Sequence, residues 1–336
     1  MKVIGVQEFL TLKSEGIPVL DTRSPAEFQS GHIPGAISFP LFENEERATI
    51  GTIYKQENKQ KAIKAGLDLI GPKMSGFIER AEALGSSQLL VHCWRGGMRS
   101  QSMAWLLELY GFQIQVLHGG YKAFRNAMLS YFEAPPALNV LSGATGSMKT
   151  RLLHEMKSLG AQVVDLEMLA NHQGSSFGNQ LSTGQPSTEQ FQNEVYEAFV
   201  QLDQSQPIWL EDESFSIGKV KLIETLYRNM QTAPHYLLVL PRGKRIAVLV
   251  ESYGKIPPEN LVQATQHIEK KLGKELCRKA VEKIRSGQLE AAVGIILTYY
   301  DKAYTKGIEK KSSFIKAEFH FNDADLREMA KKLINH

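Results

Sequence analysis

Cysteine is scarce in this sequence, which holds only Cys93 and Cys277 among its 336 residues. The two lie far apart, and neither belongs to a CxxC pair or to a cysteine–histidine cluster. This pattern argues against both a disulfide framework and a cysteine-rich zinc site. In a reducing cytosol, a lone cysteine is better considered as a thiolate nucleophile when its neighbours suit that chemistry.

Long apolar runs are also lacking, since no uninterrupted stretch approaches the roughly 18–20 residues that span a bilayer. The N-terminal MKVIGVQEFL has neither the long apolar segment nor the small-residue cleavage site of a signal peptide. Charge of one sign is not in excess, because 39 Lys and Arg residues face 36 Asp and Glu residues. We therefore expect a cytoplasmic protein without a membrane partner, and any nucleic acid must be bound by local basic patches.

The length is sufficient for two domains. Paired prolines, Pro135 and Pro136, mark the best boundary because they cannot continue a helix. We predict one domain over residues 1–133 and a second over residues 134–336. In both, short apolar strands alternate with helices, which predicts α/β folds with parallel sheets, and residues 258–302 predict a helical C-terminal part.

The predicted elements of the first domain are strands at 18–21, 89–92 and 114–117, and helices at 6–15, 25–30, 74–84 and 100–110. Those of the second domain are strands at 138–141, 162–165, 208–210, 236–240 and 317–321, and a helix at 149–159.

The segment from Leu89 to Ser100 reads as a strand, a tight loop and a helix. It places Cys93 at the carboxyl end of the strand, where α/β folds bind ligands. Two glycines let backbone N–H groups turn inward, and two arginines and the helix N-terminus favour negative charge. We predict that Cys93 is partly thiolate at neutral pH and is the catalytic residue; the alternative is a buried structural cysteine. The residues expected to build this loop are Trp94, Arg95, Gly96, Gly97, Arg99 and Ser100.

Two upstream segments, Asp21-Thr-Arg23-Ser-Pro-Ala-Glu27-Phe and Gly31-His-Ile-Pro-Gly35-Ala, complete a resemblance to the rhodanese family. The resemblance covers about residues 4–130, and His118-Gly-Gly-Tyr121 matches the segment before the last helix of that domain. It implies that Cys93 carries transferable sulfur as a persulfide. It also implies that Asp21 and Arg23 form a network beneath the active loop.

A long insertion, residues 42–73, interrupts this resemblance. Between residues 55 and 64 it contains four lysines and one glutamate, a local charge of +3. One interpretation is a solvated helix face. The other is a surface that contacts a phosphate backbone next to the sulfur site.

A second motif, Gly143-Ala-Thr-Gly146-Ser-Met148-Lys149-Thr150, follows a strand and opens a helix, as a Walker A loop does. Its backbone amides predict a phosphate cradle, with a point charge from Lys149 and a hydroxyl from Thr150 that reaches magnesium. Met148 stands where glycine is expected, and it strains the backbone if that position needs a positive φ. The alternative is an ordinary strand–turn–helix corner. The predicted phosphate-binding residues are Gly143, Thr145, Gly146, Ser147, Lys149, Thr150, Arg242 and Arg245.

Acidic residues at two further strand ends support this site. Asp165 ends one strand, and Glu211, Asp212 and Glu213 end another and look like a Walker B element that holds Mg²⁺ directly or through water. A helix cap or a solvated loop remains the alternative for each single carboxylate. A glycine-rich loop after Asp165 is predicted to cover the pocket, with His172, Gly174, Ser175 and Ser176 as its site residues.

The two halves together resemble the bacterial tRNA 2-selenouridine synthase family over essentially the whole chain, a rhodanese-like domain followed by a P-loop NTPase-like domain. Further matching segments are Glu46-Arg-Ala-x-x-Gly-Thr-x-Tyr-Lys55, Asn171-His-x-Gly-Ser-Ser-Phe-Gly178, Glu211-Asp-Glu-Ser214 and Tyr299-Tyr-Asp301. Met148 departs from the pattern and puts the phosphate-site geometry in question.

The resemblance implies a transferase that replaces sulfur by selenium at the 2-thiouridine in the wobble position of tRNA. It implies selenophosphate as donor, geranyl diphosphate as second substrate, an S-geranylated intermediate and no tightly bound cofactor except a candidate Mg²⁺. A contact with selenophosphate synthetase is compatible with it. Two alternatives remain: a sulfurtransferase with an ATP-dependent kinase or regulatory P-loop domain, and a tRNA-binding scaffold with a vestigial phosphate site.

Overall fold

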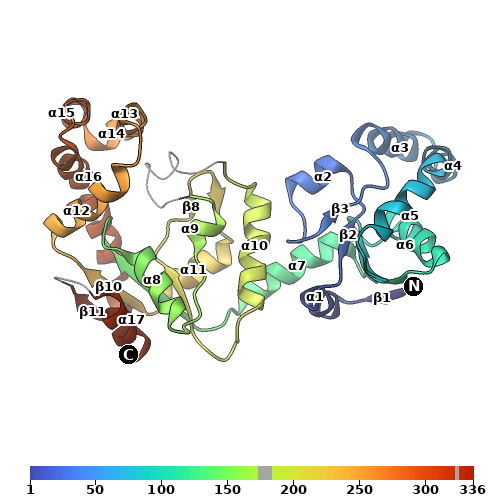
Figure 1. Cartoon of the computed structure of the whole chain (residues 1–336), viewed down its shortest axis with the longest axis horizontal. Coiled ribbons are helices and arrows are strands. Elements are labelled where there is room, and N and C mark those ends of the chain that lie inside the picture. The colour runs from blue at the N-terminus through green and yellow to red at the C-terminus, as the bar shows by residue number, and fades with distance from the viewer. Residues whose placement is uncertain (173–183, 322–324) are drawn as a thin grey trace. The chain divides into compact units, whose positions relative to one another are not determined.

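The computed structural model describes residues 1–172, 184–321 and 325–336. Contacts within the chain divide it into two compact units, Met1–Tyr131 and Phe132–His336. This division falls inside helix α7 (Gly120–Glu133), whereas the sequence placed the boundary between residues 133 and 134. Each unit has its own parallel sheet and its own core (Figure 1).

The N-terminal unit is built on a five-stranded parallel sheet with the order β1-β5-β4-β2-β3. Its strands are β1 (Lys2–Ile4), β2 (Val19–Asp21), β3 (Ile37–Ser38), β4 (Gln88–His92) and β5 (Gln113–Leu117). Its helices are α1 (Val6–Ser14), α2 (Pro25–Ser30), α3 (Asn44–Gln56), α4 (Lys59–Ile70), α5 (Met74–Glu82), α6 (Met98–Tyr110) and α7. All seven elements predicted for this unit are confirmed within two residues at each end.

Strand β4 is buried on both faces, as a central parallel strand requires. Its side chains alternate, so Leu89 and Val91 join a core with helices α5 and α6. His92 points to the other face, where it contacts the rings of Phe9 and Tyr121 from α1 and α7. The next residue, Cys93, is therefore held at the carboxyl edge of a strand that is fixed on both sides.

The insertion at residues 42–73 forms helices α3 and α4, which pack against each other, and a short 3₁₀ turn, Gly71–Lys73. Helix α3 begins with a capping box, because the N3 side chain of Glu46 accepts from the backbone of Glu43. Asn58 caps α4 by accepting from the N–H of Lys61. The insertion is thus an ordered helical hairpin.

The C-terminal unit has a four-stranded parallel sheet with the order β11-β10-β6-β7. Its strands are β6 (Leu138–Gly143), β7 (Ile208–Glu211), β10 (His235–Val239) and β11 (Ile315–His320), with a separate hairpin of β8 (Ser216–Ile217) and β9 (Val220–Lys221). Its helices are α8 (Lys149–Ser158), α9 (Leu166–Leu169), α10 (Thr188–Val200), α11 (Glu224–Thr232), α12 (Arg242–Tyr253), α13 (Pro258–His267), α14 (Glu269–Leu272), α15 (Lys274–Arg285), α16 (Leu289–Lys311) and α17 (Leu326–Ile334).

Four of the five strands predicted here are confirmed, and the strand at 162–165 is wrong. In that segment Val163 forms a single parallel bridge to Trp209. The pairing goes no further because the chain turns at Asp165, which caps α9. Leu153 and Met156 of α8 and Leu333 of α17 pack on this sheet.

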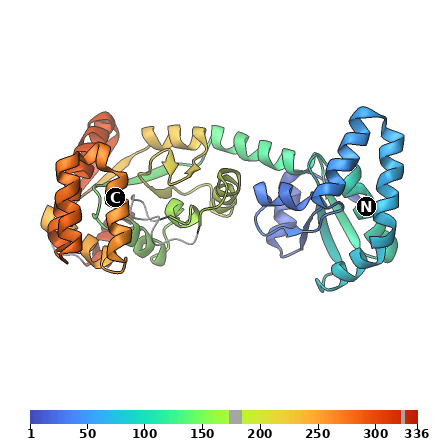
Figure 2. The same ribbon diagram turned by 90° about the horizontal axis from the view of Figure 1, so that it is seen from above.

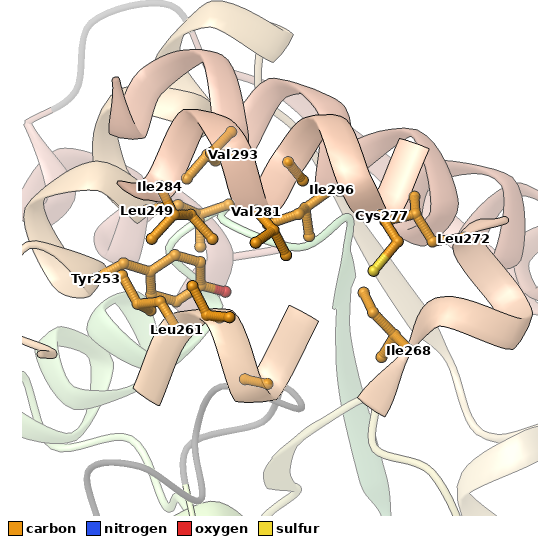
Figure 3. Packing of buried hydrophobic residues seen from close by; sticks show 14 of the residues in the cluster. Leu249, Tyr253, Leu261, Ile268, Leu272, Cys277, Val281, Ile284, Val293 and Ile296 are labelled. Carbon is orange, nitrogen blue, oxygen red and sulfur yellow. The ribbon is translucent and has the colours of Figure 1, made fainter. Parts of the chain in front are cut away.

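The predicted helical C-terminal part, residues 258–302, is confirmed as helices α13–α16, which gather with α12 at one end of this unit (Figures 1 and 2). Their apolar faces form one core, shown in Figure 3, in which Cys277 lies near Ile268 and Leu272. Burial raises the pKa of the Cys277 thiol, and the charge of Glu269 raises it further. Cys277 is therefore a structural residue. Among the described residues, no helix combines the length and hydrophobicity needed to cross a membrane.

Candidate functional site

The first candidate centre is the loop between β4 and α6. Cys93 is only 3% exposed, and its Sγ lies 3.2 Å from the Ser100 hydroxyl, which donates to it. Helix α6 begins at Met98 without a side-chain cap, so its first N–H groups remain directed toward this loop. The loop therefore offers a thiol in a setting that favours negative charge.

Glycine is required at two positions around this thiol. Gly96 has φ +64°, and a Cβ there would lie 2.8 Å from the carbonyl oxygen of Leu117. A Cβ on Gly120 would lie 2.3 Å from the carbonyl oxygen of Cys93, which instead accepts the N–H of Tyr121. The N-terminus of α7 thus approaches the loop closely and fixes its shape.

Asp21 and Arg23 form the buried support that the sequence predicted. Both are fully buried, and the Arg23 guanidinium binds the Asp21 carboxylate and the carbonyl oxygen of Gly31. The same guanidinium lies 3.9 Å from the ring centroid of Tyr121 and 5.9 Å from that of Trp94. Burial by itself raises the pKa of Asp21, but His92 and Arg23 outweigh it and hold the pKa below its ordinary value. The loop therefore rests on an ion pair.

Replacing Asp21 with asparagine should destabilise this unit by about 3–5 kcal/mol, because it leaves the buried Arg23 charge without a partner. Urea denaturation followed by circular dichroism measures the change. Glu57→Gln is the matched control, since it removes one carboxylate from an exposed helix pair with Lys61 and should leave the midpoint unchanged. Equal midpoints for the two variants would contradict the role of the buried pair.

The two loop arginines differ from each other. Arg99 binds Glu27 through two hydrogen bonds, the shorter of 2.6 Å, and Arg47 lies 3.7 Å from the same carboxylate. Burial raises the pKa of Glu27, but these arginines and the N–H of Ser24 bring it below its ordinary value. Arg95 is exposed, and the described part of the chain provides its side chain with no hydrogen bond or ion pair. Arg95 is thus available to an anion, whereas Arg99 is held by Glu27.

The second candidate centre is the loop between β6 and α8. Gly146 and Met148 both have positive φ, +83° and +62°. The backbone strain predicted for Met148 is therefore present, since a side chain occupies a left-handed position that favours glycine. Gly143 is also required, because a Cβ there would lie 2.4 Å from the Ser147 hydroxyl. The Ser147 hydroxyl is buried and lacks a hydrogen-bond partner among the described residues.

The polar side chains of this loop point at carboxylates. The Lys149 Nζ donates to the carbonyl oxygen of Gly143 over 2.8 Å and lies 3.4 Å from a Glu211 oxygen. The Thr150 hydroxyl donates to Glu211 over 2.9 Å and lies 3.4 Å from Glu167. Lys149 is buried, which lowers its pKa, but the neighbouring carboxylates raise it above its ordinary value. Lys149 therefore stays charged in the site.

Three glutamates, Glu167, Glu211 and Glu213, bring one oxygen each within 4.8 Å of one another. Burial and the charge of Glu211 raise the pKa of Glu167 to about 8, and the same causes raise that of Glu213. Such crowded carboxylates with a nearby threonine hydroxyl are a set of hard oxygen donors, which Mg²⁺ prefers. The residues present therefore fit a magnesium ion.

This cluster corrects the predicted magnesium set. Asp165 lines the same cavity but caps α9 and lies 2.6 Å from the His154 ring nitrogen. The Asp212 carboxylate accepts hydrogen bonds from the Ser142 hydroxyl and the Lys311 ammonium. Glu167, which was not among the predicted residues, joins Glu211 and Glu213 instead. The sequence feature that identifies Glu167 is an acidic residue two positions after Asp165, in the first turn of the helix that Asp165 caps.

We expect this unit to lose stability as pH rises from about 5 to about 8, and Mg²⁺ to reverse the loss. Glu167 keeps its proton up to about pH 8 in the folded state, whereas an unfolded glutamate loses it near its ordinary pKa of 4.5. The folded state then holds more protons in this window, so the unfolding free energy falls with pH. Thermal unfolding at both pH values, in EDTA and in Mg²⁺, measures it.

Glu167→Gln provides the control, because it removes one of the two carboxylates with a raised pKa and should reduce the pH dependence while weakening the effect of Mg²⁺. Unfolding temperatures in EDTA that do not change with pH would contradict the buried cluster. The result does not depend on any substrate.

A cavity of about 530 Å³ lies over the loop and the carboxylates. His172 lines it, and burial lowers the pKa of this histidine. Gly174, Ser175 and Ser176 of the predicted pocket loop lie outside the described residues. Arg242 and Arg245 do not line the cavity.

The guanidinium of Arg245 binds Asp301 through two hydrogen bonds and donates to the carbonyl oxygen of Thr145. Arg242 lies 3.6 Å from the same aspartate and donates to the carbonyl oxygen of Gly294. A Cβ on Gly146 would lie 2.9 Å from the carbonyl oxygen of Arg245. Asp301 and backbone carbonyl oxygens therefore engage both arginines outside the cavity, and Arg245 supports the phosphate loop through Thr145.

Comparison with known proteins covers both units. A family model described as the tRNA 2-selenouridine synthase AAA domain matches residues 136–334, and a rhodanese-like domain model matches residues 6–127. A tRNA 2-selenouridine synthase of Sulfurovum sp. is 32% identical, and the alignment covers 92% of this chain and 93% of that protein. Those of Shewanella denitrificans and Nitrosomonas europaea are 40% and 34% identical, over 75% and 74% of this chain and 70% and 67% of theirs.

Proposed function

Because this chain belongs to the tRNA 2-selenouridine synthase family, we propose that it replaces sulfur by selenium at the wobble 2-thiouridine of tRNA. The proposed route passes through an S-geranylated nucleoside, with geranyl diphosphate and selenophosphate as co-substrates. The observation that carries this proposal is the presence, in one chain, of a thiol loop and a separate phosphate loop with a carboxylate cluster.

In the first step, the thiouridine sulfur attacks the prenyl carbon, and the bond from that carbon to the diphosphate breaks. The nucleobase nitrogen loses its proton, and the diphosphate carries it away. The backbone amides of residues 143–150, the Lys149 ammonium and the Thr150 hydroxyl stabilise the departing charge. Glu167, Glu211 and Glu213 would hold Mg²⁺, which supplies further positive charge when bound.

In the second step, selenium replaces the alkylated sulfur, which leaves as geranylthiol. Water supplies the fourth oxygen of the phosphate released from selenophosphate, and the protons of the donor and the water end on geranylthiol, the nucleobase and phosphate. An alkylated sulfur is a far better leaving group than sulfide, which explains why geranylation comes first. Cys93 acts in this step as a nucleophile: its thiolate adds to C2 of the alkylated base and expels geranylthiol, and the selenium of the donor then displaces the cysteine sulfur, so no oxidant is needed.

A diphosphate leaving group requires no hydrolysis of ATP. Met148 fits this assignment, because its side chain occupies a left-handed loop position that NTP-binding loops of this pattern give to glycine. The competing assignment, a sulfurtransferase with an ATP-dependent domain, requires nucleotide turnover.

Incubation of 2-thiouridine tRNA with the protein, geranyl diphosphate and selenophosphate, followed by mass spectrometry of the nucleosides, tests the proposal. The expected products are S-geranyl-2-thiouridine without selenophosphate and 2-selenouridine with it. ATP turnover without geranylation would favour the kinase assignment, and tRNA binding without any turnover would favour a scaffold.

A further inference from the structure

A larger cavity, of about 990 Å³, lies within the N-terminal unit, beside the loop that follows Cys93. Its walls come from the helical hairpin α3–α4 and from the loop and first turn that follow Cys93. It lies at the upper end of the roughly 300–1,000 Å³ of ligand pockets. The side chains that line it on the thiol-loop side are Trp94, Arg95, Met98 and Arg99.

Large apolar side chains converge on this cavity although they are exposed. Tyr54, Ile63, Leu67, Trp94 and Met98 all line it, and each is among the exposed large hydrophobic residues of the chain. Leaving such a set in water is costly unless a ligand covers it. The convergence of two helices and one catalytic loop therefore indicates an apolar ligand.

The charged residues of the cavity all have the same sign. Arg47, Lys55, Arg95 and Arg99 line it, and no aspartate or glutamate does so among the described residues. Arg99 and Arg47 face the carboxylate of Glu27, whereas Arg95 has no such partner in the described part of the chain. An apolar wall with a cationic rim matches a hydrocarbon chain attached to an anionic molecule.

We propose that this cavity holds the ten-carbon prenyl chain of the S-geranylated wobble nucleoside during the selenium step, with the flanking RNA phosphates at the cationic rim. This assignment rests on the proposed function, which makes such a nucleoside the substrate of the Cys93 loop. In this assignment, the insertion at residues 42–73 supplies most of the apolar wall that binds the hydrocarbon chain next to the thiol loop.

Equilibrium binding of two anticodon stem-loop RNAs, one carrying S-geranyl-2-thiouridine and one carrying S-methyl-2-thiouridine, tests the site without turnover. Fluorescence anisotropy in the absence of selenophosphate should show at least tenfold tighter binding of the geranylated RNA. Leu67→Glu, which places a carboxylate in the apolar wall, should abolish this preference. The residue is 64% exposed, so the fold should tolerate the change.

Leu109→Glu is the matched control, because Leu109 is 70% exposed on α6 and does not line the cavity. It should retain the geranyl preference. Arg95→Gln should weaken binding of both RNAs equally and reduce its salt dependence, as loss of one phosphate contact does. Equal binding of the two RNAs by the unaltered protein, or loss of preference in Leu109→Glu, would overturn the assignment. Self-association that Leu67→Glu abolishes would assign the cavity to a second copy instead.

The outcomes also separate this site from the proposed function. Turnover to 2-selenouridine without any geranyl preference would remove the hydrocarbon site and leave the function standing. A geranyl preference that Leu67→Glu removes, in a protein that forms neither product, would support the site and overturn the function.

Discussion

Replacing Cys93 with serine should reduce selenium incorporation by at least about 10³-fold while geranylation of the same tRNA continues at nearly the unaltered rate. A serine hydroxyl is almost the same size as a thiol but does not ionise at neutral pH, so it removes the nucleophile and keeps the loop. The neighbouring Ser100 hydroxyl, 3.2 Å from Sγ, can donate to an oxygen in the same place. Geranylation depends on the phosphate loop of the other unit, so it should continue.

The measurement is mass spectrometry of nucleosides from tRNA incubated with geranyl diphosphate, with and without selenophosphate. Cys277→Ala is the matched control: it removes the other cysteine, which lies in the helical core, and selenium incorporation should persist. Loss of both reactions in Cys93→Ser, with an unchanged unfolding temperature, would contradict the division of the chemistry between the two units.

The thiol loop could be predicted from sequence because its determinants lie close together along the chain. Gly96 has the positive φ that its place in the turn implied, and Asp21 and Arg23 form the expected buried pair. The partner of Arg99 could not be predicted in the same way. Glu27 lies 72 positions away, and its side chain also closes the capping box of α2, so its position depends on the packed fold.

The carboxylate cluster could be predicted only in part from the acidic residues that follow the strands. Parallel strands do bring Glu211 to the loop, as expected from their shared edge. Consecutive carboxylates diverge, however, because side chains alternate along the chain, so Asp212 turns to Ser142 and Lys311. Glu167 reaches the cluster through the first turn of α9, a helix of four residues that was not among the predicted elements.

The cavity between the α3–α4 hairpin and the loop after Cys93 could not be predicted from the sequence, because it also depends on how distant segments pack. Its apolar residues recur at helical spacing in α4, as in Ile63 and Leu67, and such a stripe is normally buried against the rest of the protein. Only the structure shows that this stripe faces the loop after Cys93 and stays exposed. Two interpretations were open for the lysines between residues 55 and 64, and each fits one of them. Lys55 lines the cavity, whereas Lys61 pairs with Glu57 on the exposed helix surface.

Replacing Lys149 with alanine should have the opposite effect to Cys93→Ser. Geranylation should fall by about 10²–10³-fold, because a preorganised positive charge aimed at the departing diphosphate is lost. Selenium incorporation into tRNA that already carries S-geranyl-2-thiouridine should continue, since that reaction does not use the phosphate loop. Mass spectrometry of tRNA supplied in each form measures the two reactions separately.

Lys157→Ala is the matched control, because Lys157 lies on the same helix, is exposed and does not line the cavity. It should leave both reactions unchanged. Removal of Lys149 also removes the cation that lowers the pKa of Glu167 and of Glu213, so both pKa values should rise further and the loss of stability with pH should extend to higher pH. This second readout separates loss of the charge from unfolding of the loop. Loss of both reactions in Lys149→Ala, or of neither, would contradict the assignment of the phosphate loop to the geranylation step alone.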